Sequence, residues 1–161
     1  MQLKIDVAAN PSPCQLNFYD DGSFGQGEPW FFLDYEINLS FTGSLELLAS
    51  KESGICYCLE GFSWKNYLKA RQGEIDLGSV EEGQLLVIFG PEDPTEWGTG
   101  YGKEFGLAFV DLKQKLALYG AKPSGAEIIR FAQGQFVCQL RDEVVGFIVD
   151  FSAAFVSEQS Q

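Results

Sequence analysis

Residues 33–42 read Leu33-Asp34-Tyr35-Glu36-Ile37-Asn38-Leu39-Ser40-Phe41-Thr42, with apolar and polar side chains in strict alternation. Successive side chains of a β-strand point to opposite faces, so this period of two predicts a strand with one face on a core and one in water. That arrangement is typical of an antiparallel sheet. Gly43 ends the pattern, and residues 45–49 are expected to return as a hairpin partner.

Further segments share the length and the β-branched or aromatic content of strands, and Gly, Pro or Asp separate them. They are Leu3–Val7, Cys14–Tyr19, Ile55–Leu59, Leu85–Phe89, Phe105–Asp111, Lys115–Tyr119, Glu127–Phe131 and Phe136–Leu140. Leu85–Phe89 is apolar throughout, which favours a central strand. Residues 111–114 are expected to connect two strands as a hairpin.

Two segments change to a helical period. Ser63 suits the N-cap of a short helix over residues 64–71, with Gly73 beyond its end. A second helix is predicted over Asp142–Ser157, where Asp142 is a good N-cap and Gly146 indicates close packing. Its apolar stripe consists of Val144, Phe147, Ile148, Phe151, Ala154 and Phe155.

These patterns predict one α+β domain over residues 1–161, with residues 157–161 as a polar tail. The expected architecture is a predominantly antiparallel β-sheet, with a short mid-chain helix and a C-terminal amphipathic helix that closes over one face. Strand order stays open, because many antiparallel topologies share this pattern.

The composition favours binding over catalysis. The chain has no histidine, which is the commonest general base and metal ligand, so the expectation is no enzyme, no metal site and no cofactor. Its 23 Asp and Glu against 11 Lys and Arg leave a formal charge of −12. Such a surface repels phosphate and attracts cations, which argues against nucleic acid and for a basic protein partner.

The compartment is expected to be the cytoplasm. No apolar run approaches the ~18 residues of a membrane-spanning helix, and no signal peptide is visible. Four cysteines, Cys14, Cys56, Cys58 and Cys138, are too few for a disulfide scaffold, although their redox state stays open. Cys56 and Cys58 are expected to point to the same side of a strand.

Two loops combine acids, glycines and large aromatic residues, namely residues 19–30 and 90–102. Tryptophan and tyrosine are enriched at interface hot spots, and carboxylates beside them steer a basic partner. The alternative is that the aromatic rings tuck back against the sheet. The candidate partner-binding residues are Asp20, Asp21, Glu28, Trp30, Glu92, Asp93, Glu96, Trp97 and Tyr101.

The order of these elements resembles that of a known family. A β-rich first half with the strand at 32–41, the short helix with Trp64 and Leu68, and a final strand and helix over 135–155 resemble the small acidic immunity proteins of bacterial polymorphic-toxin systems, including the WapI-type group. The resemblance implies a non-enzymatic protein that neutralises a basic cognate toxin by occluding it. It brings no catalytic residues.

Three other functions stay open: a hydrolase that uses carboxylates and a divalent metal, a DNA-mimicking antagonist, and a subunit of a larger assembly. The first would use pairs such as Asp20-Asp21 or Glu92-Asp93, although adjacent acids in loops are usually solvated turns. The second would need carboxylates along extended faces. The third would show as stable oligomers, and the oligomeric state is open.

Overall fold

A computed structural model describes residues 1–19, 21–31, 35–40, 45–61, 71–93, 99–152 and 155–156. Throughout these ranges the regular secondary structure is β, so the α+β prediction is wrong and the described chain is all-β. Within the same ranges no helix is long and apolar enough to cross a membrane. The short helix predicted over 64–71 falls almost entirely outside the described residues, and Arg71 itself begins a strand.

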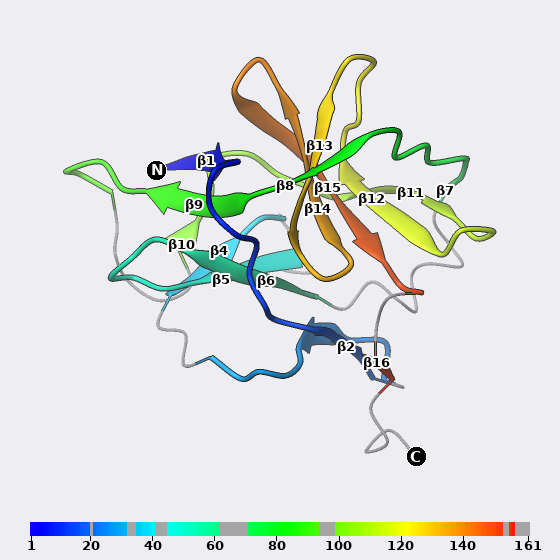
Figure 1. Ribbon diagram of the computed structural model, residues 1–161, viewed down its shortest axis with the longest axis horizontal. Helices are drawn as coiled ribbons and strands as arrows, with labels where there is room; N and C mark the ends of the chain where they lie inside the picture. The colour runs from blue at the N-terminus through cyan, green and yellow to red at the C-terminus, as the bar shows by residue number, and fades with distance from the viewer. Residues whose placement is uncertain are drawn as a thin grey trace.

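The strands form three sheets (Figure 1). Sheet 1 is a two-stranded ribbon of β1 (Gln2–Asp6) and β9 (Gln84–Ile88). Sheet 2 has the order β10 (Thr99–Gly100), β4 (Tyr35–Asn38), β5 (Leu45–Ala49), β6 (Cys56–Gly61), β3 (Phe24–Gln26), β2 (Leu16–Phe18) and β16 (Phe155–Val156). Sheet 3 has the order β7 (Arg71–Gln72), β11 (Leu107–Asp111), β12 (Leu116–Gly120), β15 (Glu143–Asp150), β14 (Gln135–Leu140), β13 (Glu127–Ala132) and β8 (Val80–Glu82).

The main core lies between sheets 2 and 3. The inward alternation of β4 and β5 supplies Tyr35, Ile37, Leu45 and Leu47, and sheet 3 supplies Tyr119, Ile129, Phe131, Phe147 and Val149. Leu3, Leu85 and Val87 of sheet 1 complete it. The predicted hairpin is confirmed, because β4 and β5 pair antiparallel with Ile37 opposite Leu47.

The predicted C-terminal helix is wrong, because residues 143–150 form β15 between β12 and β14. Both faces of β15 are covered: Phe147 lies in the main core, whereas Ile148 lies on the outer side of sheet 3. A strand buried on both faces has a nearly continuous apolar sequence, which periodicity alone cannot separate from a helix. Arg141 and Asp142 both have positive φ, so Asp142 forms the tight turn from β14 to β15 instead of an N-cap.

Two finer predictions about strands are also wrong. Leu85–Phe89 was expected to be central, but β9 pairs along its length only with β1, and Ile88 is 43% exposed. In β6, the pairing with β5 shifts at Tyr57, with Cys58 opposite Leu48 and Cys56 opposite Ala49. Because Tyr57 is an extra residue in this pairing, Cys56 points into the main core and Cys58 points to the outer face of sheet 2.

A strap of seven residues, 73–79, crosses the outer face of sheet 3. It joins β7 at one edge of the sheet to β8 at the other, as the green segment of Figure 1 shows. Ile75 of the strap is 1% exposed and packs with Leu116, Leu118, Ile128, Phe136, Cys138 and Ile148. The strap therefore covers a second hydrophobic cluster that the sheet alone would expose.

Candidate functional site

The outer face of sheet 2 brings three carboxylates together. Alternation along β4, β5 and β6 turns Glu36, Glu46 and Glu60 away from the main core, and Glu46 lies directly opposite Glu60. The side chains of Glu36 and Glu46 are hydrogen-bonded to each other. We call these three residues the glutamate cluster.

The carboxylates of the glutamate cluster disfavour one another's charge. Partial burial, the hydrogen bond with Glu36, and the charges of Glu36 and Glu60 raise the pKa of Glu46 to about 8. Partial burial and the charge of Glu36 also raise the pKa of Glu60. Within the described part of the chain, none of the ion pairs includes these glutamates. The cluster is therefore a place where an added cation relieves repulsion.

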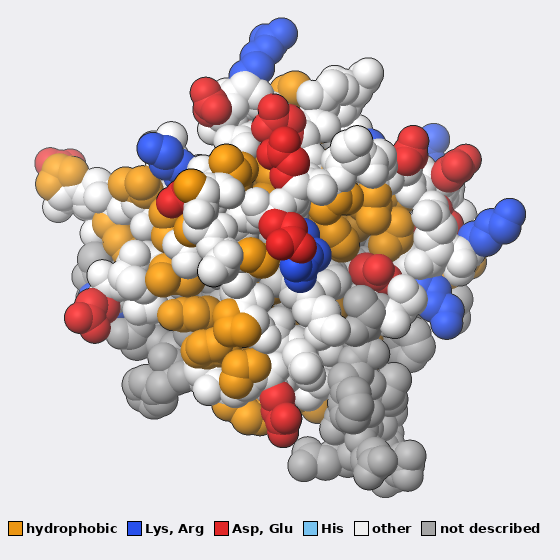
Figure 2. All heavy atoms as spheres, in the orientation of Figure 1, with side chains coloured by type: hydrophobic (Ala, Val, Ile, Leu, Met, Phe, Trp, Pro, Cys, Tyr) orange, Lys and Arg blue, Asp and Glu red, His pale blue; other side chains and the backbone are white. Residues whose placement is uncertain are grey.

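An exposed tryptophan precedes a phenylalanine that packs on this same face of sheet 2. After β3 the chain crosses the outer face of sheet 2, where the ring of Phe31 stacks on Tyr57 with centroids 4.3 Å apart. Phe31 also packs on a small cluster that contains Leu48, which lies opposite Glu36. The preceding residue, Trp30, is 64% exposed. In Figure 2, hydrophobic side chains gather in the lower left of the view, over the region that β4–β6 occupy in Figure 1.

A glutamine fixes this aromatic segment. The Gln26 Oε1 atom accepts a hydrogen bond from the Phe31 backbone N–H at 2.6 Å, and its Nε2 atom donates to the Phe31 carbonyl at 3.3 Å. Both the N–H and the carbonyl of Phe31 are hydrogen-bonded, so the backbone that follows Trp30 is fixed. This face of sheet 2 therefore carries the glutamate cluster and a held backbone segment that leads to the exposed Trp30.

The other predicted residues of the first loop are peripheral to this arrangement. Glu28 is exposed, and its carbonyl accepts a hydrogen bond from Gln15 N–H at 2.8 Å. Asp21 is exposed and accepts hydrogen bonds from the N–H and hydroxyl groups of Ser23, which shapes the β2–β3 turn. Asp20 lies outside the described residues.

The described residues of the second predicted loop, 90–93 and 99–102, make other contacts. Asp93 pairs with the α-amino group of Met1 and accepts a hydrogen bond from Gly90 N–H, and these contacts lower its pKa. Tyr101 is half-buried, and its ring stacks on Phe105 against the main core. Glu92 is exposed, whereas Glu96 and Trp97 lie outside the described residues. Strands β4, β5 and β6 separate β10, in this loop, from β3.

Sequence reasoning missed the glutamate cluster, although part of its signal was present. The alternation over 33–42 already turned Glu36 outward. Glu46 and Glu60 join it only through the register of β4, β5 and β6, which a single strand's pattern does not specify.

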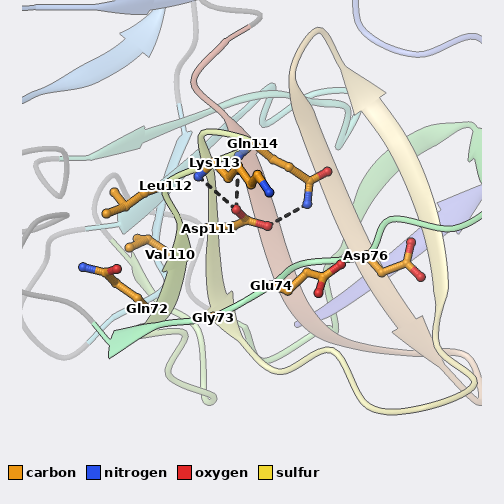
Figure 3. Close-up of a pocket in the computed structure, with 9 residues that line it drawn as sticks. All are labelled: Gln72, Gly73, Glu74, Asp76, Val110, Asp111, Leu112, Lys113 and Gln114. Carbon is orange, nitrogen blue, oxygen red and sulfur yellow. Dashed lines mark hydrogen bonds between the residues drawn. The ribbon is translucent and has the colours of Figure 1, made fainter.

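A pocket of about 640 Å³ lies between the strap and the β11–β12 hairpin (Figure 3). Its buried carboxylate, Asp111, accepts hydrogen bonds from Ile75 N–H at 3.0 Å and from Gln114 Nε2 at 2.6 Å. Together with the backbone N–H groups of Lys113 and Gln114, these donors lower the pKa of Asp111. Asp111 therefore holds the strap to the hairpin, and this stabilisation is present above its ordinary pKa and lost as the pH falls through its lowered pKa.

Nothing in the described ranges gathers three or more His, Cys, Asp or Glu side chains in an arrangement that could hold a metal ion. The outer face of sheet 2 is the stronger candidate, because its exposed Trp30 and its glutamate cluster are available to a partner.

The glutamate cluster predicts a pH-dependent stability. Folding raises the pKa of Glu46 from an ordinary 4.5 to about 8, so its stabilising contribution is complete below 4.5 and is lost as the pH rises through 8. Glu46→Gln is therefore expected to raise the Tm at pH 8.5 by roughly 2–4 °C, a value reduced for the partial exposure of the side chain, and to change it little at pH 4. Thermal unfolding followed by circular dichroism at both pH values checks this. Glu52→Gln, at an exposed position, is the control, and equal shifts at both pH values would contradict the electrostatic origin.

Comparison of the chain with protein-family models found no match, and comparison with curated protein sequences found none either.

Proposed function

We propose that this chain is a non-enzymatic binding protein, an immunity-type inhibitor that neutralises a basic toxin by occluding it. The observation that carries the proposal is the exposed Trp30, whose neighbour Phe31 packs on the outer face of sheet 2, the face that bears the glutamate cluster. The proposed location is the cytoplasm, which suits four unbridged cysteines.

Charge and aromatic surface have different roles in this proposal. The formal charge of −12 attracts a basic partner over a distance of about one Debye length, roughly 8 Å at physiological salt, and raises the association rate. At contact, Trp30 displaces water from an apolar pocket on the partner and slows dissociation. Exposed acids outside this face, such as Glu92, add to the long-range attraction only.

The glutamate cluster gives this binding a pH dependence. A Lys or Arg of the partner that enters the cluster stabilises its ionised form and lowers the raised pKa of Glu46. Binding below about pH 8 therefore releases a proton, so the affinity rises with pH up to about 8 and levels off above it, where Glu46 is already ionised.

Capture from the source cells with matched variants tests the proposal. The tagged chain, Trp30→Ala, the triple variant Glu36→Gln/Glu46→Gln/Glu60→Gln, and the control triple Glu52→Gln/Glu104→Gln/Glu127→Gln are compared at low and high salt. The two triples remove the same number of carboxylates, but the control positions are exposed and lie outside strands β4, β5 and β6. The captured polypeptide is then produced alone and its binding kinetics are measured.

We expect a stoichiometric basic polypeptide that is retained by the chain and by the control triple, and that leaves as salt rises. Trp30→Ala should weaken its binding at least tenfold, mainly through faster dissociation, because truncation of a hot-spot residue costs roughly 2 kcal/mol or more. The Glu36, Glu46 and Glu60 triple should lower the association rate and its salt dependence more than the control triple does. Equal losses in both triples would reduce the role of this face to net charge, and unchanged binding by Trp30→Ala would remove it as the contact surface.

A further inference from the structure

Two of the four cysteines are in contact beneath the segment that carries Trp30. Cys14, before β2, and Cys58, in β6, are both fully buried and share a small cluster with Leu48, which Phe31 covers. The two side chains lie close enough for each to shift the pKa of the other. They are far apart in sequence, and the shifted pairing at Tyr57 turns Cys58 towards Cys14.

The other two cysteines have different surroundings. Cys56 lies in the main core, and Cys138 lies in the cluster under the strap. Burial raises the pKa of both thiols, which disfavours the reactive thiolate. The fold therefore separates one contacting pair from two isolated, unreactive thiols.

The contacting pair is asymmetric. The Cys14 side chain interacts with Cys58 and with the backbone of Gly27, and its own S–H donates to the Gln15 carbonyl at 3.4 Å. Cys58 and Gly27 lower the pKa of Cys14 against the opposing effect of burial, whereas Cys14 and burial raise the pKa of Cys58. Cys14 is thus the more readily ionised of the two thiols, and Cys58 holds its proton more tightly.

We propose that Cys14 and Cys58 are a redox site that closes to an intramolecular disulfide when a peroxide reaches it. The Cys14 thiolate attacks one oxygen of hydrogen peroxide, the O–O bond breaks, and a Cys14 sulfenic acid forms while the departing hydroxide takes a proton to become water. The Cys58 sulfur then attacks the Cys14 sulfur and its proton leaves with the hydroxyl group as a second water. Two thiols are oxidised, one peroxide is reduced to two waters, and the resting state is the dithiol.

Access to this site is controlled by the segment above it. Because both sulfurs are fully buried, peroxide reaches Cys14 only when Phe31 moves off the cluster, and Gln26 holds Phe31 in place. Oxidation is therefore expected to be slow in the native chain and faster in Gln26→Ala. This inference goes beyond the proposed function and does not depend on the identity of a partner.

Mass spectrometry of the full chain tests the redox site. The reduced protein is exposed to hydrogen peroxide under native conditions, alkylated and weighed intact, then digested. We expect a mass decrease of about 2 Da, a peptide pair linked through Cys14 and Cys58, and alkylation of Cys56 and Cys138 after unfolding. The oxidised form should have a Tm roughly 5–10 °C higher, and a thiol reductant should reverse this gain.

Three single variants separate the roles. In Cys58→Ala the Cys14 sulfenic acid should accumulate and react with a dimedone-type probe, whereas Cys14→Ala should give neither the probe adduct nor the disulfide. Cys138→Ala is the control and should still form the disulfide. The proposal would be overturned by disulfides through Cys56 or Cys138, or by disulfide-linked dimers. It would also be overturned if no Cys14–Cys58 peptide formed and the oxidation rate of Gln26→Ala equalled that of the parent chain. A loss of partner binding in the variants of the glutamate cluster would not affect the redox proposal.

Discussion

Gly146→Ala is expected to destabilise this protein by about 3 kcal/mol or more, which places the variant near or beyond the limit of folding. A Cβ atom at position 146 would lie 2.1 Å from the carbonyl oxygen of Ala121 and 2.9 Å from that of Tyr119. Both contacts are with backbone atoms, so no change of side-chain rotamer relieves them. The only relief is separation of β12 from β15 at the centre of sheet 3.

The close approach at Gly146 comes from a pair of facing glycines. Gly146 in β15 lies opposite Gly120 in β12, and Gly120 has φ +78°. The Ala121 N–H donates to the Val145 carbonyl at 2.9 Å, which pulls the two strands together just beyond the pair. Gly146 was expected to pack closely within a helix; the close packing is present, but between strands.

Urea unfolding of Gly146→Ala against the parent chain measures this effect. Gly106→Ala is the matched control, because a Cβ atom there meets no atom within 4 Å and the backbone has no positive φ. The control should shift the unfolding free energy by no more than about 0.5 kcal/mol. A Gly146→Ala variant as stable as Gly106→Ala would mean that β12 and β15 do not pack as described.

Ile75→Ala is expected to destabilise the protein by roughly 2–5 kcal/mol and to loosen the strap. Ile75 is the strap residue that is buried in the cluster on the outer face of sheet 3, at 1% exposure. Its removal leaves a cavity over Leu118 and Ile148 that the neighbouring strands cannot fill, because they are held in register by their ladders. The polar contacts of Asp111 and Gln114 with the backbone of Ile75 remain, so the loss is one of packing.

Equilibrium unfolding and amide hydrogen exchange together check the role of Ile75. The free energy should fall as stated, and amides of residues 73–79 and of β7 and β8 should exchange faster than those of β14 and β15. Val80→Ala in β8 is the control, since Val80 is 40% exposed and its truncation should cost about 0.5 kcal/mol or less. Uniform acceleration over all strands would show that the strap is not a separate unit of stability.

The functional and redox proposals meet on the outer face of sheet 2. Phe31 separates the Cys14–Cys58 pair from the surface, and the adjacent Trp30 is the proposed anchor for a basic partner. The Gln26 side chain controls the position of both aromatic residues through the backbone of Phe31. Measurements on Gln26→Ala therefore report on both sites, whereas the Glu36, Glu46 and Glu60 variant reports only on the partner surface.

Several strands could be predicted from local sequence because their determinants are local. The alternation at Tyr35–Asn38, the return strand Leu45–Ala49 and the 111–114 connection are all present where the pattern indicated. At Tyr35–Asn38 one face is apolar and the other polar, and the return strand and the 111–114 connection are marked by adjacent turn residues, so neighbours in sequence carry the signal. The absence of histidine and the net charge of −12 are likewise properties of the sequence alone.

The conformation of the C-terminal segment and the side-chain clusters on the sheets were decided by tertiary structure alone. These features depend on residues that are distant in sequence. Whether Val144 to Val149 forms a helix or a strand is settled by β12 and β14 on either side and by a covered outer face, none of which is encoded within the segment. Strand register then assembles Glu36, Glu46 and Glu60, and one shifted residue at Tyr57 turns Cys58 to Cys14. A shift of one residue reverses the direction of every side chain, so a local pattern specifies the faces of a strand but not which side chains meet on them.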